Sequence, residues 1–188
     1  MHPLTQEEGQ LALRAARTYA ESAVTEDAGT PAPSFPPVFD ELRGVFVTLN
    51  TNGRLRGCIG YPYPVLPLKD AIRDAAVHAC LNDPRFPAVT PEELGAISIE
   101  VTILSRPEPL ECPPEERQNH IKIGTHGIIA RIGARSGLLL PQVAVEFGWN
   151  TEEFLSQTCI KAGLNPDAWH SAECSIQLFE GQIFCEEQ

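Results

Sequence analysis

The sequence predicts an α+β fold, with a mainly antiparallel sheet and flanking helices. Segments with the apolar spacing of helices and segments with the alternation of strands are mixed along the chain, without the regular repetition of a parallel sheet. The dipeptide Asn52-Gly53, a strong hairpin signal, joins two strand-like segments at residues 45–49 and 55–60. These two segments are therefore expected to be antiparallel neighbours.

Length and composition indicate one globular domain over residues 1–188, with 43% apolar and 21% charged residues. A net charge of −11 argues against general binding to nucleic acid or to an anionic membrane, since both need clustered lysine and arginine. No apolar run is long enough to span a bilayer, and the first ten residues do not resemble a signal peptide. We therefore expect a cytoplasmic protein.

The first helix is predicted to begin after Thr5. Thr5 and Glu8 form a capping box, and apolar residues then recur every four positions from Leu11 to Ala23. The helix cannot continue through residues 29–37, which hold four prolines and are expected to form an extended loop.

The middle of the chain predicts a helix, a loop, a short helix and a strand. Residues 67–81 have a helical apolar stripe that includes Cys80, and residues 83–87 form a loop held between two prolines. A capping box at Thr90 predicts a short helix. Residues 97–103 alternate as a half-buried strand, with Glu100 central on its polar face.

The last part of the chain is predicted to be irregular first and regular later. Residues 106–118 are rich in proline, and residues 121–140 suggest strands around glycine turns. Helices are expected after Pro141 and after Asn150, and a last strand over residues 174–178.

The six cysteines are predicted to be reduced thiols, most of them in the core, because no pair has C-x-x-C spacing and no set has the spacing of a zinc site. No metal site is predicted from them. They are Cys58, Cys80, Cys112, Cys159, Cys174 and Cys185.

Residues 55–60, with the sequence L-R-G-C-I-G, form the main candidate site. Glycine within a strand marks a bulge or a close approach of backbone or ligand. A period of two places Arg56 and Cys58 on one face, where the guanidinium would lower the pKa of the thiol. In the alternative, a two-residue hairpin loop puts Cys58 opposite Val47, on the face of Leu49, as a buried and inert thiol, whereas a three-residue loop reverses the facing.

Three other residues are candidates, each with a plain structural alternative. His126, between two glycines, can transfer protons from a turn or can simply bond to the backbone. Glu100 can orient a histidine or act as a base, or it can face water. Arg85 can hold an anion, or it can pin its own loop by bonds to carbonyls.

Taken together, these segments resemble the AMMECR family, and they cover nearly the whole chain in the same order. The length and the C-terminal segment resemble its prokaryotic branch. The matching segments are R-G-V-F-V-T-L at 43–49, L-R-G-C-I-G at 55–60, D-P-R-F-P at 83–87, I-E-V-T-I-L at 99–104, H-G at 126–127, L-L-P-Q-V-A at 139–144 and K-A-G-L at 161–164.

The resemblance implies an α+β fold with one larger and one smaller lobe and a cleft near L-R-G-C-I-G. It makes Arg56, Gly57 and Cys58 the signature of the family, and it supplies neither a reaction nor a cofactor. The prokaryotic branch is often encoded beside a Memo-type protein and a radical-SAM protein, the AmmeMemoRadiSam grouping, which makes these two the expected partners.

Two functions are compatible with these residues. The first is an enzyme or covalent carrier in which Cys58 is the nucleophile, His126 its base and Glu100 the group that orients the imidazole. Arg56, Gly57 and Arg85 would then bind a small anionic substrate. The second is a non-catalytic module that binds a small molecule or a partner protein, with Cys58 as a small filler. A nucleic-acid role ranks third because of the negative charge.

Overall fold

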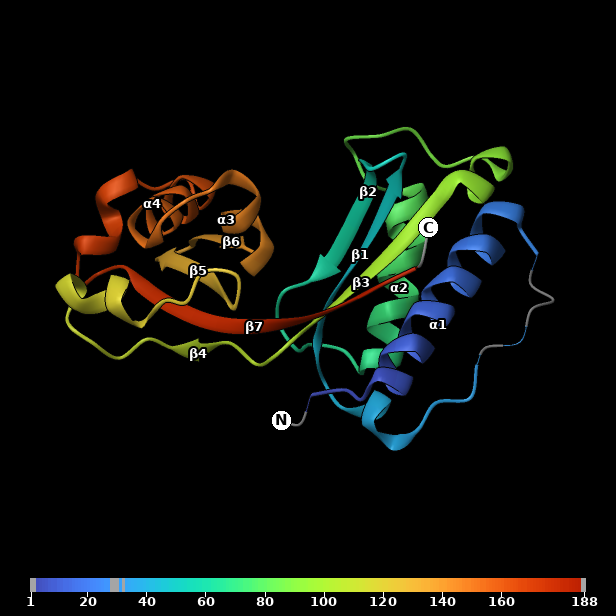
Figure 1. Cartoon of the computed structure of the whole chain (residues 1–188), viewed down its shortest axis with the longest axis horizontal. Helices are drawn as coiled ribbons and strands as arrows, with labels where there is room; N and C mark the ends of the chain where they lie inside the picture. The colour runs from blue at the N-terminus through green and yellow to red at the C-terminus, as the bar shows by residue number, and fades with distance from the viewer. Residues whose placement is uncertain (1–2, 28–30, 32, 187–188) are drawn as a thin grey trace. The chain divides into compact units, whose positions relative to one another are not determined.

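The computed structural model describes residues 3–27, 31 and 33–186 (Figure 1). Part of the loop predicted over residues 29–37 therefore lies outside the described residues. Within unit 1, defined below, the elements are α1 (Gln6–Thr25), η1 (Pro37–Asp40), β1 (Gly44–Thr51), β2 (Arg54–Tyr61), α2 (Leu68–Leu81), η2 (Pro91–Ala96) and β3 (Ile97–Leu104). They are followed by β4 (Glu108–Pro109), η3 (Pro114–His120), β5 (His126–Ile132), β6 (Arg135–Leu139), α3 (Pro141–Phe147), α4 (Thr151–Lys161), η4 (Pro166–His170) and β7 (Ser175–Cys185).

The mixed α+β fold is confirmed. The strands are hydrogen-bonded in the order β2-β1-β3-β7-β5-β6, with β4 paired to β7. The chain divides into two compact units: unit 1 is Met1–Leu104 with Gln182–Gln188, and unit 2 is Ser105–Gly181. Strand β7 begins in unit 2 and ends in unit 1. No helix among the described residues is long and apolar enough to cross a membrane.

Unit 1 has its core between two helices and one face of its strands. Helices α1 and α2 lie side by side, as Figure 1 shows, and their apolar stripes pack on β1 and β3. Thr5 caps α1 through a capping box with Glu8, so the capping box predicted from the sequence is confirmed. The strand residues on this face are fully buried or nearly so, and they are Val45, Val47, Leu49, Ile99, Val101 and Ile103.

Unit 2 has a smaller core around α4. This helix is capped by Asn150 as predicted, and it packs on β5 and β6. The predicted irregular segment at residues 106–118 contains β4, in which Pro109 pairs with Gln177 of β7, and the start of η3. The prediction was wrong there because a two-residue strand leaves no visible alternation in the sequence.

The β1–β2 hairpin differs from the prediction by one residue. Its turn is the expected two-residue one, with positive φ at Asn52 (52°) and Gly53 (72°). The register then shifts at a bulge, so that Arg56 has no partner on β1 and Cys58 pairs with Thr48. The alternative in which a two-residue loop puts Cys58 opposite Val47 was therefore wrong, because the bulge reverses the facing. The same bulge interrupts the period of two that predicted Arg56 and Cys58 on one face.

Candidate active site around Cys58

The backbone of Cys58 is held by the loop that follows α2. Strand β2 is at the edge of the sheet order, so its outer backbone groups have no neighbouring strand. The Cys58 N–H donates to Asp83 Oδ2 at 2.8 Å, and the Cys58 carbonyl accepts from Arg85 Nη2 at 3.0 Å. The loop therefore replaces a strand at this one residue, and it fixes the position from which the Cys58 side chain leaves the sheet.

Asp83 is the centre of this arrangement, and the sequence reasoning missed it. Its side chain is 1% exposed and accepts from Arg85 Nε at 2.9 Å and Arg85 Nη2 at 2.6 Å. The Arg85 guanidinium, helped by the backbone N–H groups of Cys58 and Arg85, holds the pKa of Asp83 well below its usual range. A signal was present in the D-P-R spacing, because an acid two residues before an arginine in a rigid loop can close such a pair.

The Cys58 thiol lies on the face of β1–β3 that points away from α1 and α2. Thr48 Oγ1 donates to Cys58 Sγ at 3.3 Å, and Thr48 pairs in turn with Glu100 of β3. Cys58, Thr48 and Glu100 therefore form one polar row across three strands. The structure brings two predicted site residues, Cys58 and Glu100, into this row.

The pKa of Cys58 is raised, mainly because the half-buried sulfur is poorly solvated. The Thr48 hydroxyl and the Arg85 charge act in the opposite direction, and the charges of Asp83 and Glu100 add to the increase. The expectation that the Arg56 guanidinium lowers this pKa was wrong, because Arg56 is paired with Glu93 and the arginine that does act on the thiol, Arg85, is outweighed by burial. At neutral pH Cys58 is a thiol that needs a proton acceptor in order to react.

Glu100 is a candidate acceptor on this face. Its carboxylate accepts from Thr102 Oγ1 at 3.3 Å and from Cys185 Sγ at 3.6 Å. Cys185 is an exposed thiol at the end of β7 that the sequence reasoning did not single out. No histidine is among the hydrogen-bond partners of Glu100 in the part of the chain that the structure describes.

Arg56 forms an ion pair with Glu93. Its Nε and Nη2 donate to the two carboxylate oxygens of Glu93 at 2.8 and 3.0 Å, and Nη1 donates to the Pro87 carbonyl at 3.0 Å. Arg56 therefore stabilises the loop between α2 and η2. This is the kind of structural role that was considered from the sequence as the alternative for Arg85. Arg85 is also engaged, by Asp83 and by the Cys58 carbonyl, but its side chain is 52% exposed.

Gly57 is required by packing rather than by backbone conformation. A Cβ at this position would lie 2.3 Å from the Ala79 carbonyl oxygen of α2. At Gly60 a Cβ would lie 2.2 Å from the Val45 carbonyl oxygen. The glycines of the signature therefore allow β2 to approach α2 and β1 closely, and the bulge at Arg56 accompanies them.

His126 belongs to unit 2, where it is the first residue of β5 rather than part of an exposed turn. Its imidazole is 18% exposed, accepts from the Lys122 N–H at 3.2 Å through Nδ1, and lies 4.0 Å from Glu180 through Nε2. This is the backbone-bonded arrangement that the structural alternative describes. Its role as the base of Cys58 stays a prediction.

The cysteines are all free thiols. Cys80, Cys159 and Cys174 are buried, so half of the six, rather than most, belong to the core. No group of three histidine, cysteine or acidic side chains among the described residues is arranged to hold a metal ion.

Comparison with known proteins decides the family. The model of the AMMECR1 family matches residues 13–184. The chain belongs to the AMMECR1 family. Among AMMECR1 relatives, a protein from Thermococcus gammatolerans is 48% identical, over 100% of this chain and 94% of its own length. One from Methanosarcina barkeri is 49% identical, over 98% of this chain and 93% of its own length.

A solved AMMECR1 structure has the same fold. It is the crystal structure of an uncharacterized protein from Pyrococcus horikoshii, which is 45% identical and superposes with a TM-score of 0.92 over 98% of this chain and 94% of that one. The names of these relatives define no activity, so the family assignment gives no reaction, and the function must be argued from the site.

Proposed function

We propose that this AMMECR1 protein is an enzyme or covalent carrier in which Cys58 bonds to a small anionic substrate. One observation carries the proposal: the Cys58 thiol shares a row with Thr48 and Glu100, and the half-exposed Arg85 guanidinium lies beside it. These groups supply a nucleophile, a base and a cation, which nucleophilic catalysis on an anionic substrate can use.

The proposed step begins with the neutral thiol. The Cys58 S–H bond breaks, its electron pair forms an S–C bond to an electrophilic carbon, and the bond from that carbon to its leaving group breaks. The proton passes to Glu100, with the Thr48 hydroxyl between the two groups in the strand register, and then to the leaving group. Arg85 would bind the anionic part of the substrate through Nη1, the guanidinium nitrogen that the Asp83 and Cys58 contacts do not use.

The proposal includes the cellular compartment and the partner proteins. Six free thiols suit a reducing compartment, and we therefore place the protein in the cytoplasm. A carrier needs partners that load and unload it, and the Memo-type and radical-SAM proteins implied by the family resemblance are the partners we propose.

The test compares two alkylating reagents that differ in charge. Iodoacetate and iodoacetamide form the same type of S–C bond, so the ratio of their rates at Cys58, measured by mass spectrometry, reports the local preference for an anion. We expect this ratio to be about threefold or more above that of N-acetylcysteine. The Arg85→Gln variant should lose the excess, and Arg106→Gln, which removes an exposed arginine of unit 2, should keep it.

Glu100→Gln provides a second arm. Alkylation consumes the thiolate already present at a given pH and does not report the proposed proton transfer to Glu100. Removal of the carboxylate charge lowers the pKa of Cys58, so alkylation of the free protein at pH 8 should become faster. A Cys58 thiol that stays unreactive in the folded protein even at pH 10, or a rate ratio equal to that of N-acetylcysteine, would overturn the proposal and leave the non-catalytic module.

A further inference from the structure

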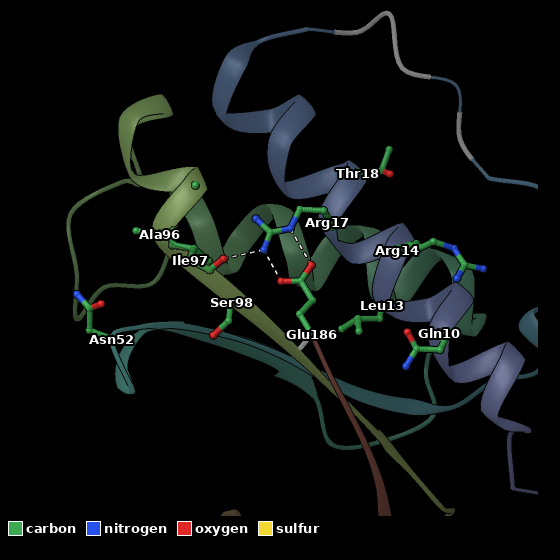
Figure 2. Close-up of a pocket in the computed structure, with 11 residues that line it drawn as sticks. Gln10, Leu13, Arg14, Arg17, Thr18, Asn52, Ala96, Ile97, Ser98 and Glu186 are labelled. Atoms are coloured by element: carbon green, nitrogen blue, oxygen red, sulfur yellow. Dashed lines mark hydrogen bonds and ion pairs between the residues drawn. The ribbon is translucent and has the colours of Figure 1, made fainter. Parts of the chain in front are cut away.

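A cavity of about 930 Å³ lies within unit 1, between α1, the start of β3 and Glu186 after β7 (Figure 2). This volume is in the range of small-molecule binding sites. The cavity belongs to residues that the Cys58 site does not use, and the argument for it is independent of the proposed function.

One wall of the cavity is the ion pair between Arg17 and Glu186. Arg17 Nε donates to Glu186 Oε1 at 2.8 Å and Nη2 bonds to Oε2, as the dashed lines in Figure 2 show. Glu186 Oε2 also accepts from the Ile99 N–H at 2.8 Å, and Arg17 Nη2 donates to the Ile97 carbonyl at 2.7 Å. The charge of Arg17 is therefore balanced inside the protein, and this pair ties α1 to β3 and to the residue after β7.

The Ser98 hydroxyl donates to the Asn50 carbonyl at 3.5 Å, but four other polar side chains of the cavity form no hydrogen bond among the described residues. Arg14 lies one turn before Arg17 on α1, is exposed, and makes no hydrogen bond or ion pair with any residue that the structure describes. The side chains of Gln10, Thr18 and Asn52 also line the cavity, and each is without a hydrogen-bond partner among the described residues. The cavity thus offers one uncompensated cation together with amide and hydroxyl groups.

We propose that this cavity binds a small molecule with one anionic group, a carboxylate or a phosphate, on a body that carries hydroxyl or amide groups. The Arg14 guanidinium presents a fork that matches either anion. The amides of Gln10 and Asn52 and the hydroxyl of Thr18 both donate and accept, which suits neutral polar groups of the ligand. Leu13 and Ile97 supply apolar wall between them.

Two variants test separately the positive charge of the cavity and its free volume. Arg14→Gln removes the cation and keeps a polar side chain of similar length. Gly95→Phe fills the cavity: Gly95 lines it, and a Cβ there would meet no atom within 4 Å, so a larger side chain has room. Arg106→Gln, an exposed arginine of unit 2, is the matched control. Thermal unfolding of each variant checks that the fold is retained.

The experiment is an NMR titration of the ¹⁵N-labelled full chain with glucuronate, glucose 6-phosphate and glucose. We expect saturable shifts of the amides of residues 10–18 and 95–98 with glucuronate, glucose 6-phosphate or both, and binding of glucose that is about tenfold or more weaker. Which anion binds more tightly identifies the group that Arg14 recognises. Arg14→Gln should weaken binding about tenfold or more, Gly95→Phe should abolish it, and Arg106→Gln should leave it unchanged.

Three results would overturn the proposal: no saturable shift with either anion at millimolar concentration, equal binding of glucose, or unchanged binding by Arg14→Gln. Because Arg14 is exposed and makes no contact that the fold needs, this variant folds and decides the matter even where Gly95→Phe does not fold. Alkylation of Cys58 reports on the other site, so failure of one proposal is distinguishable from failure of the other.

Discussion

The two units of the molecule stabilise their arginines by different means. In unit 1, Arg85 is paired with Asp83 and Arg56 with Glu93, so each cation beside the signature segment has a carboxylate of its own. In unit 2, Arg117 is only 6% exposed, yet it forms no ion pair with a carboxylate among the described residues. A buried cation without an acid is costly unless other groups are turned toward it.

In unit 2, backbone carbonyls and a pair of thiols compensate the buried charge of Arg117. Arg117 Nη1 donates to the carbonyls of Trp169 and Ser171, and Nη2 donates to the Cys174 carbonyl at 2.8 Å. Cys159 and Cys174 are both buried and hydrogen-bonded to each other. The Cys159 thiol, aided by the charge of Arg117, lowers the pKa of Cys174. The two arginines beside the signature segment of unit 1 are thus balanced by groups that lose their charge in acid, whereas the carbonyls around Arg117 do not titrate.

The largest effect is expected at Arg117. Arg117→Met removes the donors of three backbone carbonyls inside unit 2, so the free energy of unfolding should fall by about 3 kcal/mol or more. Urea unfolding measures this loss. Arg131→Met, an exposed arginine in the same unit, should change stability by no more than about 0.5 kcal/mol. Equal losses in the two variants would contradict the role assigned to Arg117.

Asp83→Asn should have the next largest effect, and it should depend on pH. The variant keeps the shape of the side chain but loses the charge that binds Arg85, so the loss at pH 7 should be about 2 kcal/mol. Because the pKa of Asp83 is lowered in the folded state, its stabilising effect is complete above the unfolded value of about 3.9 and declines as the pH falls further.

The difference in stability between wild type and Asp83→Asn should therefore shrink below about pH 4. The loss caused by Arg117→Met should stay constant over the same range, because neither the guanidinium nor a carbonyl titrates there. Urea unfolding of both variants at pH 7 and pH 3 measures the contrast between the units. A pH-independent loss for Asp83→Asn would show that its charge is not what holds Arg85.

Local signals were enough to predict the helices and the hairpin turn. The capping boxes that begin at Thr5 and Asn150 each close within four residues, and both are present in the structure. The Asn52-Gly53 turn depends only on two residues that accept positive φ. Where both partners of an interaction lie within a few residues, the sequence contains the whole of the physical argument.

The candidate site was harder to predict, because its contacts are distant in the sequence. The bulge at Arg56 moves Cys58 to the other face of β2, and a register shift depends on what both strands pack against. The carboxylate that engages Arg56 is Glu93, which lies 37 residues away. Cys58 and Glu100 were both chosen from the sequence, yet their place in one row with Thr48 depends on two strand pairings.

In one respect the units are alike, and a matched pair of variants tests this. A Cβ at Gly57 in β2 would lie 2.3 Å from the Ala79 carbonyl oxygen of α2, and one at Gly137 in β6 would lie 2.3 Å from the Ala162 nitrogen after α4. Each glycine lets a strand meet the end of a helix. Gly57→Ala and Gly137→Ala should each lower the free energy of unfolding by about 1–3 kcal/mol.

Gly95→Ala is the control for both, because a Cβ there meets nothing within 4 Å. It should leave stability unchanged or increase it by a few tenths of a kcal/mol, about the gain from a less flexible unfolded chain. Urea unfolding of the three variants, side by side, checks the comparison. A neutral Gly57→Ala would mean that β2 can move away from α2, and that the signature glycine is needed for something other than packing.

The smallest effect is expected at Thr48, and it concerns the thiol rather than the fold. In unit 2 the sulfur of Cys174 is stabilised by another thiol, whereas in unit 1 the sulfur of Cys58 receives a hydrogen bond from the hydroxyl of Thr48 at 3.3 Å. Thr48→Val keeps the shape of the side chain and removes this donor, so the pKa of Cys58 should rise further. Alkylation of Cys58 by iodoacetamide at pH 8 should then slow by about threefold.

Thr158→Val is the control. It removes a hydroxyl bonded to the Phe154 carbonyl in unit 2, and it should leave the alkylation rate of Cys58 unchanged. An unchanged or faster rate in Thr48→Val would show that the hydroxyl does not stabilise the Cys58 thiolate, and that Arg85 alone opposes the effect of burial on this sulfur.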